Sequence, residues 1–250
     1  NGGKTWSNIG LEKTRHIADI AIHPTNADIV YVAAQGTVHG PNADRGVYKS
    51  TDGGNSWNRV LFINDSTGIA SLSMDMNNPR ILYATSWEHR RYPWTVSSGG
   101  KGSAIWKTTD GGNTWTKLTE GLPDMMGKIG ISVSRANSNR VFAIVDTEKT
   151  KSGLYRSDDA GKTWALLSNN QDISSRSWYY MKVYADTKDE NLVYVLNAPM
   201  MRSIDGGKTF SNVNVGHGDT HDLWIHPKNN NEIGLADDGG GEISYDQAKS

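Results

Sequence analysis

The segment His217-Gly218-Asp219-Thr220-His221-Asp222 holds a dense group of side chains that could bind a ligand or transfer a proton. If it forms a β-strand, residues 217, 219 and 221 project to one side, with neighbours about 6.6 Å apart. His221 and Asp219 could then hold a metal ion with a third group. They could equally bind an organic ligand or make structural hydrogen bonds, and all three interpretations stay open. Asp219 and Asp222 are the candidate catalytic residues.

A second group of basic and aromatic side chains lies within residues 87–102. Guanidinium groups beside aromatic rings can clamp an anionic or sugar ligand. A solvated loop whose rings cover a neighbouring part of the fold is the alternative. The side chains concerned are His89, Arg90, Arg91, Tyr92 and Trp94.

Carboxylates offer two further kinds of chemistry. Asp237 and Asp238 precede three glycines and could bind Ca²⁺ through carboxylate and backbone oxygens. A plain turn is the alternative. We predict that the chain needs no metal or other cofactor. Glycoside hydrolysis needs two carboxyl groups about 5–10 Å apart across the scissile bond. The sequence sets no such separation, and it contains no P-loop, dinucleotide fingerprint, nucleophile elbow or HExxH motif. The candidate carboxylates are Asp219, Asp222, Asp237, Glu88 and Asp172.

One octapeptide occurs four times, and it predicts the strands and turns that position these groups. Its copies are STDGGNSW (50–57), TTDGGNTW (108–115), SDDAGKTW (157–164) and SIDGGKTF (203–210). The glycines permit positive φ, the aspartate can accept hydrogen bonds from the amides of its own turn, and the aromatic ring can pack between units. We therefore predict a structural role for these residues: Asp52, Trp57, Asp110, Trp115, Asp159, Trp164, Asp205 and Phe210.

A second repeat alternates with the octapeptide, as in IHPTNADIVY (22–31), ADTKDENLVY (185–194) and IHPKNNNEIG (225–234). Its polar middle and β-branched end predict a tight turn between two strands. Together the repeats give four short strands, A to D, in each unit of about 45–50 residues, which is one propeller blade. We predict an all-β propeller of four-stranded antiparallel blades, with the octapeptide as the hairpin between strands C and D.

The pattern S-x-D-x-G-x-[ST]-[WF] resembles the Asp-box, or bacterial neuraminidase repeat. That repeat occurs in sialidases, xyloglucan-active glycosidases, sortilin-type receptors and photosystem II assembly factors. With its Asn-rich turns, the chain resembles the large secreted bacterial sortilin-like proteins that are often labelled glycosyl hydrolases. The resemblance implies boxes on the face away from the ligand site and an extracellular, periplasmic or cell-surface location. Sialidase activity is discounted, because Tyr179 and Tyr180 have no evident Glu partner and no arginine motif is visible.

Four complete blades are predicted at about 11–62, 63–118, 119–168 and 169–213, with a partial blade at 214–250 and a further strand within 1–10. Both ends of the sequence carry the middle of the octapeptide. In a closed ring, the two ends would instead supply complementary parts of one octapeptide. We therefore expect one propeller region that is a segment of a larger propeller, of roughly seven or more blades. A closed five-bladed ring is the alternative.

The loops opposite the octapeptides are the expected binding face, because variable loops on a repeating scaffold usually carry function. The loops joining strands B and C are residues 35–45, 87–102, 146–152 and 237–241, and those leading into the next strand A include 169–177 and 214–218. The candidate ligand-binding residues are His39, His89, Arg90, Arg91, Trp94, Arg176, Trp178, Tyr179, His217 and His221.

Composition limits the classes of partner. The formal net charge is −1 with both signs dispersed, so a nucleic-acid partner is not expected. No apolar run approaches the roughly 18 residues of a membrane span. Nine Trp and ten Tyr suit sugar- or peptide-binding surfaces, and the absence of Cys excludes disulfides. We expect a binding or assembly scaffold for a protein, peptide or glycan; a glycoside hydrolase with carboxylate acid/base catalysis is the alternative.

Overall fold

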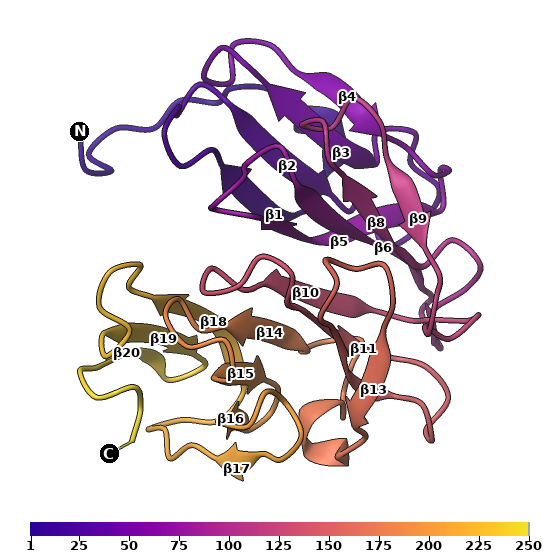
Figure 1. The fold of residues 1–250 in the computed structure, drawn as a ribbon. Helices are drawn as coiled ribbons and strands as arrows, with labels where there is room; N and C mark the ends of the chain where they lie inside the picture. Colours follow the sequence, from indigo (N-terminus) through magenta and orange to yellow (C-terminus); the bar gives the residue numbers. More distant parts are fainter. Residues whose placement is uncertain (250) are drawn as a thin grey trace.

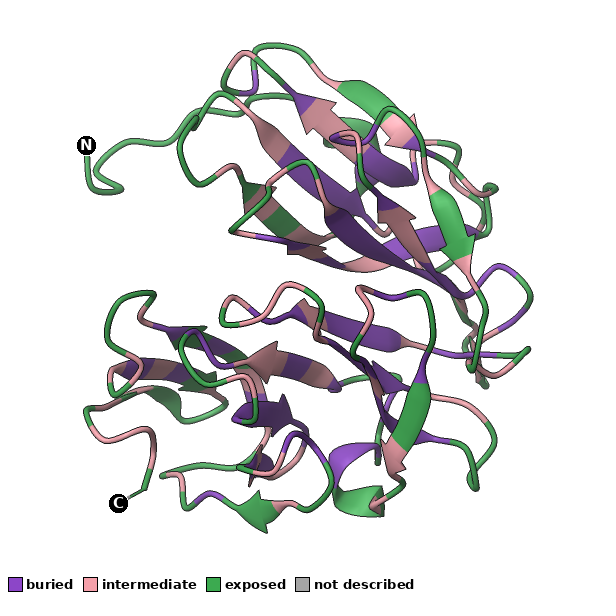
Figure 2. Ribbon diagram, viewed as in Figure 1, coloured by how far each residue is buried: buried purple, intermediate pink, exposed green. Residues whose placement is uncertain are grey.

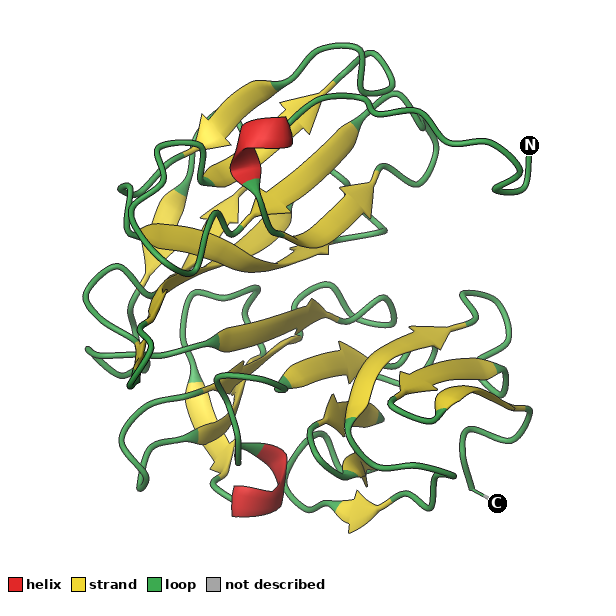
Figure 3. Ribbon diagram, turned by 180° about the vertical axis from the view of Figure 1, so that it is seen from behind, coloured by secondary structure: helices red, strands yellow, loops and turns green. Residues whose placement is uncertain are grey.

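The chain folds into five antiparallel sheets, as seen in a computed structural model that describes residues 1–249 (Figure 1). Ser250, the last residue of the predicted fifth blade, lies outside the described residues. Besides the strands, the described part of the chain has two single-turn 3-10 helices, η1 (Glu12–Thr14) and η2 (Gln171–Ile173) (Figure 3). The predicted all-β propeller is confirmed. Within residues 1–249 there is no helix with the length and apolarity to cross a membrane.

Each sheet follows the chain from its first strand to its last. Blade 1 contains β1 (Ile17–Ile22), β2 (Val30–Ala34), β3 (Gly46–Ser50) and β4 (Asn58–Leu61). Blade 2 contains β5 (Thr67–Met74), β6 (Leu82–Arg91), β8 (Ala104–Thr108) and β9 (Thr116–Leu118), with β7 (Val96–Ser98) paired to β6. Blade 3 contains β10 (Ile129–Val133), β11 (Val141–Val145), β12 (Gly153–Ser157) and β13 (Ala165–Ser168).

Blade 4 contains β14 (Lys182–Ala185), β15 (Val193–Leu196), β16 (Met200–Ser203) and β17 (Ser211–Asn212). Blade 5 has three strands, β18 (Thr220–Ile225), β19 (Ile233–Asp237) and β20 (Gly240–Ser244). The second strands of the first four blades are almost wholly buried, except for the last four residues of β6, whereas the fourth strands are largely exposed (Figure 2). The four hydrophobic cores lie between successive blades, and Trp115, Trp164 and Phe210 each pack into one of them.

The octapeptide turns are closed by their own side chains. In the second copy, Asp110 Oδ1 accepts from Thr114 N at 2.9 Å and from Thr108 Oγ1 at 2.8 Å, and Asp110 Oδ2 accepts from Thr114 Oγ1 at 2.7 Å. Thr108 Oγ1 accepts in turn from Gly112 N at 2.9 Å. The other three complete copies repeat this network. Because Gly111 and Gly112 have φ values of 72° and 91°, the turn needs residues that tolerate the left-handed region.

The same turns hold successive blades together through one backbone carbonyl. Tyr31 Oη, from blade 1, donates to Gly111 O in the turn of blade 2 at 2.8 Å, and Lys49 Nζ donates to the same oxygen at 2.8 Å. Tyr83 Oη and Lys107 Nζ of blade 2 bind Ala160 O of blade 3 at 2.9 and 2.6 Å. We call this arrangement the box clamp. In it, an aromatic residue of the second strand and a cation of the third strand bind one backbone carbonyl in the octapeptide turn of the next blade.

The box clamp changes along the chain. Between blades 3 and 4, Arg156 donates to Gly206 O at 2.9 Å, while Phe142 supplies a ring without a hydroxyl. Between blades 4 and 5, Tyr194 Oη donates to Gln247 O at 3.2 Å. Blade 5 has Gly234 at the aromatic position and Ile243 at the cation position. It therefore cannot form this clamp with any further blade.

The turns and the variable loops lie at opposite ends of the blades. In blades 1 and 2, Gly53 N donates to Asp28 O and Gly111 N to Arg80 O, so these octapeptides lie beside the turns between their first and second strands. Loops at the other ends bind one another, as Arg91 N to Val38 O shows. We call these ends the box face and the loop face.

Acid should weaken the turns. Hydrogen bonds from Ser56 lower the pKa of Asp52 to about 2, and hydrogen bonds from Thr114 lower the pKa of Asp110 to about 2, from 3.8. A lowered folded-state pKa stabilises the fold above the unfolded-state value, and this stabilisation is lost as pH falls through the folded-state value. We predict that the free energy of unfolding declines from about pH 4 to about pH 2. In the Asp52→Asn/Asp110→Asn variant, chemical denaturation should show lower stability at pH 7 and a shallower decline; an unchanged slope would contradict this origin.

The box clamp should tolerate loss of a hydroxyl but not of a ring. Tyr83→Phe removes one bond to Ala160 O, which keeps Lys107, so we predict a cost of about 0.5–1.5 kcal/mol. Tyr83→Ala also leaves a cavity and should cost about 3–5 kcal/mol. Urea denaturation checks both values, with Tyr245→Phe as a control because Tyr245 is exposed. Equal losses for Tyr83→Phe and Tyr83→Ala would show that the ring contributes nothing.

Candidate functional site

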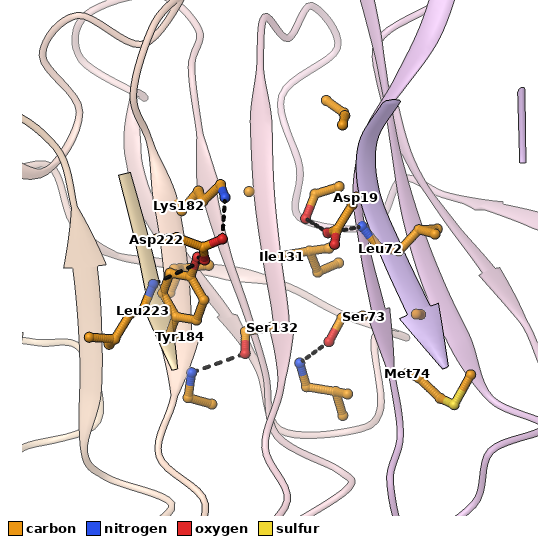
Figure 4. A pocket seen from close by; sticks show the side chains of 18 of the residues that line it. Asp19, Leu72, Ser73, Met74, Ile131, Ser132, Lys182, Tyr184, Asp222 and Leu223 are labelled. Atoms are coloured by element: carbon orange, nitrogen blue, oxygen red, sulfur yellow. Dashed lines mark hydrogen bonds and ion pairs between the residues drawn. The ribbon is translucent and has the colours of Figure 1, made fainter. Parts of the chain in front are cut away.

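The first strands of all five blades line one central channel with a volume of about 900 Å³ (Figure 4). The register of each first strand against its second identifies the residue at the same position in every blade. Three of these residues are charged, and they come from blades 1, 4 and 5. The five residues in chain order are Asp19, Ser71, Gly130, Lys182 and Asp222, and we call them the channel belt.

Asp19 is held by the amides of two blades. Its carboxylate accepts from Ile20 N at 2.9 Å, from Leu72 N at 2.9 Å and from Ser71 Oγ at 3.3 Å. Burial outweighs these bonds and the positive charge of Lys182, and it raises the pKa of Asp19 above 3.8. A carboxyl group in this setting holds its proton more readily than one in water.

Asp222 faces the same channel but has charged and phenolic partners. Tyr184 Oη donates to its Oδ1 at 2.5 Å, Leu223 N donates to the same oxygen at 3.0 Å, and Lys182 Nζ lies 3.5 Å from Oδ2 (Figure 4). Burial and the Asp222 carboxylate raise the pKa of Tyr184 well above 10. Asp19 and Asp222 therefore occupy equivalent positions in different electrostatic surroundings.

The local fold explains why both aspartates turn into the channel. The ladder between first and second strands is interrupted immediately before Asp19, before Ser71 and before Asp222. Such β-bulges re-aim side chains and are common beside functional sites. Blades 3 and 4, which have Gly130 and Lys182 at this position, pair without interruption.

Lys128 lies where the channel meets the loop face. Its Nζ donates to Tyr180 O at 2.8 Å and to Tyr179 O at 3.1 Å, and it lies 5.6 Å from the centre of the Trp87 ring. His89 stacks on Trp87 with ring centres 3.9 Å apart. Burial, aided by the charges of Lys128, Arg45 and Arg91, lowers the pKa of His89 to about 4 despite the hydrogen bond to Ser97 O, which acts in the opposite direction.

A cluster of aromatic and charged side chains from blades 4 and 5 lies on the loop face. Arg176 lies 5.0 Å above the Tyr180 ring and 3.7 Å from Asp219. His221 Nε2 lies 2.7 Å from Asp238 Oδ1 and packs against Tyr180. Burial and a hydrogen bond with Asp219 raise the pKa of Tyr180 to about 12. We call these residues, with the adjoining Trp178 and Tyr179, the mouth cluster.

The backbone of the mouth cluster is strained at three non-glycine residues. Arg176, Met181 and Asp219 have φ values of 53°, 84° and 59°. Such conformations cost free energy and are retained where the surroundings fix them, often at binding sites. Trp178 and Tyr179 are 43% and 51% exposed, and their ring centres lie 5.9 Å apart. The cluster therefore combines an open aromatic surface with side chains whose positions are fixed.

The structure corrects the prediction for residues 217–222. The strand begins only at Thr220, and Asp219 lies in the left-handed region, so residues 217, 219 and 221 do not share one side of a strand. His221 pairs with Asp238 and Asp219 pairs with Arg176, so the proposed His221–Asp219 metal pair does not form. His217 is exposed and its Nδ1 bonds to Gly218 O. The glycines on both sides of His217 favour a turn over a strand.

The prediction of a loop at residues 87–102 is also wrong. Arg90 and Arg91 lie in β6, which continues to Arg91 and pairs with β7. Successive strand residues project to opposite faces, so the two arginines cannot clamp one ligand together. Arg90 lies over Tyr92, and Trp94 projects from the turn of this hairpin with 80% of its surface exposed. His39 is exposed on the neighbouring loop of blade 1.

Protein groups occupy one oxygen of Asp237 in the Asp237–Asp238 turn, whereas its Oδ2 is buried without a hydrogen-bond partner. Asp237 Oδ1 accepts from Gly239 N and Gly240 N at 2.8 Å each, and Asp238 pairs with His221. Among residues 1–249, no three His, Cys, Asp or Glu side chains converge as metal ligands.

Asp19, Lys128 and Lys182 are the functional candidates that sequence reasoning missed. Alignment of the repeats could have found Asp19, because IADIAIHP (17–24) and HDLWIHP (221–227) superpose Asp19 on Asp222. Lys128 has no local signal. Its position depends on where the carbonyls of Tyr179 and Tyr180 lie in the neighbouring blade.

Comparisons with known proteins agree with this architecture. The chain is 23% identical over 252 residues to an oligoxyloglucan reducing-end-specific xyloglucanase of Emericella nidulans, covering 78% of the chain and 31% of that protein. It is 25% identical over 208 residues to a xyloglucanase of Acetivibrio thermocellus, covering 68% of the chain and 23% of that protein. The chain thus spans about a quarter to a third of the length of these relatives.

Two solved structures show the same fold. The GH74 enzyme of Niastella koreensis matches with a TM-score of 0.64 and 17% identity, over 95% of this chain and 38% of that one. YCF48 from Cyanidioschyzon merolae matches with a TM-score of 0.59 and 13% identity, over 96% and 70% respectively. The family model Sortilin-Vps10, described as sortilin, neurotensin receptor 3, matches residues 1–153 and 47–199, which together span 1–199 of the 250 residues. The chain therefore belongs to the Sortilin-Vps10 family.

Proposed function

We propose that this chain is a secreted binding propeller that holds a glycan chain at the mouth cluster and in the channel behind it. The open aromatic surface of Trp178 and Tyr179, on a strained backbone beside Arg176 and His221, is the observation that carries the proposal. Aromatic rings with one polar edge suit the faces and hydroxyls of sugars. The related xyloglucanases favour a glycan over a protein or peptide ligand.

The channel favours hydrolysis as a second candidate function. Asp19 and Asp222 face one channel from equivalent strand positions, with the pKa of Asp19 raised by burial and Asp222 paired with Lys182. Glycosidases divide acid and base roles between two carboxyl groups in such unequal surroundings. Asp219 lies in the mouth cluster, where its pairing with Arg176 suits binding better than catalysis.

We further propose that the five blades are part of a larger propeller. Blade 5 has Gly234 and Ile243 in place of the clamp residues, so it is not built to hold the turn of blade 1. Gly54 in that turn packs on Ile9 and Trp57 and not on an aromatic residue of a second strand. Additional blades between blades 5 and 1 would supply the missing contacts.

Removing the exposed rings should weaken glycan binding. Trp178→Ala and Tyr179→Ala each delete part of the open surface, and we predict about tenfold or greater loss of affinity for xyloglucan oligosaccharides by isothermal titration calorimetry. Trp6→Ala is the matched control, because Trp6 is 90% exposed on the N-terminal segment. Equal affinity of all three variants and the parent, or binding of peptides alone, would overturn the proposal.

A hydrolysis assay tests the second candidate function separately. The binding proposal predicts that xyloglucan incubated with the protein releases no more reducing sugar than with the Asp19→Asn/Asp222→Asn variant. If the second candidate is right, either single substitution should instead lower a measurable rate by about a hundredfold or more. Such a loss, with unchanged thermal stability, would replace binding by catalysis as the function of the channel.

A further inference from the structure

Lys128 is a partly buried cation without a counter-charge. Nζ donates to the carbonyls of Tyr179 and Tyr180 and lies over the Trp87 ring, and among residues 1–249 no carboxylate oxygen lies within 4.0 Å of it. Burial, and after it the positive charge of Lys182, lowers the pKa of Lys128 to about 8. An uncompensated charge removed from water is costly, so such charges are normally paired.

The position of Lys128 indicates where the counter-charge must come from. Lys128 lines the channel together with Trp87, Gln35 and Lys182. An ammonium group has three N–H donors, and the two carbonyls account for two of them. The third remains for a group inside the channel. His89 stacks on the Trp87 ring, and Trp87 is only 4% exposed, so this ring forms a wall of the position and not a stacking surface for ligand.

Two other cations near the loop end of the channel, Lys182 and Arg45, already have partners. Lys182 is paired with Asp222, and Arg45 donates to the carbonyls of Gln35, Thr37 and Gly40. Asp19 is saturated by amides and a hydroxyl group. Arg45, Arg91 and Lys128 all act electrostatically on His89, so three cations gather on this side of the channel mouth. An entering anion would meet Lys128 as its open partner.

We propose that Lys128 binds the carboxylate of an acidic sugar, so that the glycan held by this propeller carries uronic acid residues. The inference rests on the proposed glycan-binding function and adds the charge of the ligand. The carboxylate would accept the third N–H of Lys128 and supply the missing counter-charge at the inner end of the mouth cluster. The exposed aromatic rings of the mouth cluster would then contact the sugar rings of the glycan, and Lys128 inside the channel would bind its carboxylate.

The test compares trigalacturonate with its methyl ester, which has the same sugar rings without charge. Calorimetry should show that trigalacturonate binds about tenfold to hundredfold more tightly than the ester, as expected for a charged hydrogen bond. Lys128→Met should abolish that difference, whereas Lys128→Arg should retain part of it. Lys101→Met is the matched control, since Lys101 is exposed on the loop between β7 and β8.

Three outcomes would overturn the proposal. Equal binding of acid and ester would remove the anion site while leaving neutral glycan binding intact. Binding of an acidic peptide in place of trigalacturonate would reject a sugar as the ligand. A preference for the acid that survives in Lys128→Met would place the anion elsewhere. If Lys128→Met unfolds, Lys128→Arg and a thermal melt with trigalacturonate decide: the proposal requires that trigalacturonate, unlike its ester, raises the melting temperature of both parent and Lys128→Arg.

Discussion

The fold depends on one backbone carbonyl in the octapeptide turns of blades 2, 3 and 4. The Asp side chain closes the turn by accepting hydrogen bonds from within it, and this presents the carbonyl to the preceding blade. There the oxygen accepts from an aromatic hydroxyl and a lysine, as Gly111 O does from Tyr31 and Lys49. The octapeptide is thus a turn within one blade and a contact between two. Local turn chemistry and the packing of the propeller therefore impose the same residues at each repeat.

The box clamps also set the positions of the candidate site. They lie on the box face, where the octapeptides bind the turns between first and second strands, and they leave the loop face free of structural repeats. The first strands are held side by side, as when Ser73 Oγ accepts from Val133 N at 2.9 Å and Ser132 Oγ from Ala185 N at 3.0 Å. A rigid wall of this kind lets Asp19, Lys182 and Asp222 face one channel although they come from three blades. The chain belongs to the Sortilin-Vps10 family.

The fold was predictable from sequence because its determinants are local and repeated. Asp, Gly and hydroxyl residues at fixed spacing specify the turn, and the Asn-rich segments specify the return between strands. The site was less predictable because it depends on irregular backbone and on contacts between blades. The left-handed Asp219, the bulge before Asp19 and the extension of β6 through Arg90 and Arg91 have no repeated signal. Lys128 is an isolated lysine in the sequence and becomes notable only beside the carbonyls of Tyr179 and Tyr180.

The central claim is that the box face maintains the structure while the loop face and channel bind ligand. Hydrogen–deuterium exchange with and without a saturating glycan oligosaccharide tests this division most directly. The account predicts slower exchange in residues 174–182 and 217–222, with the turns at 50–57 and 108–115 unchanged. Protection concentrated in those turns, with the mouth cluster unaffected, would contradict it.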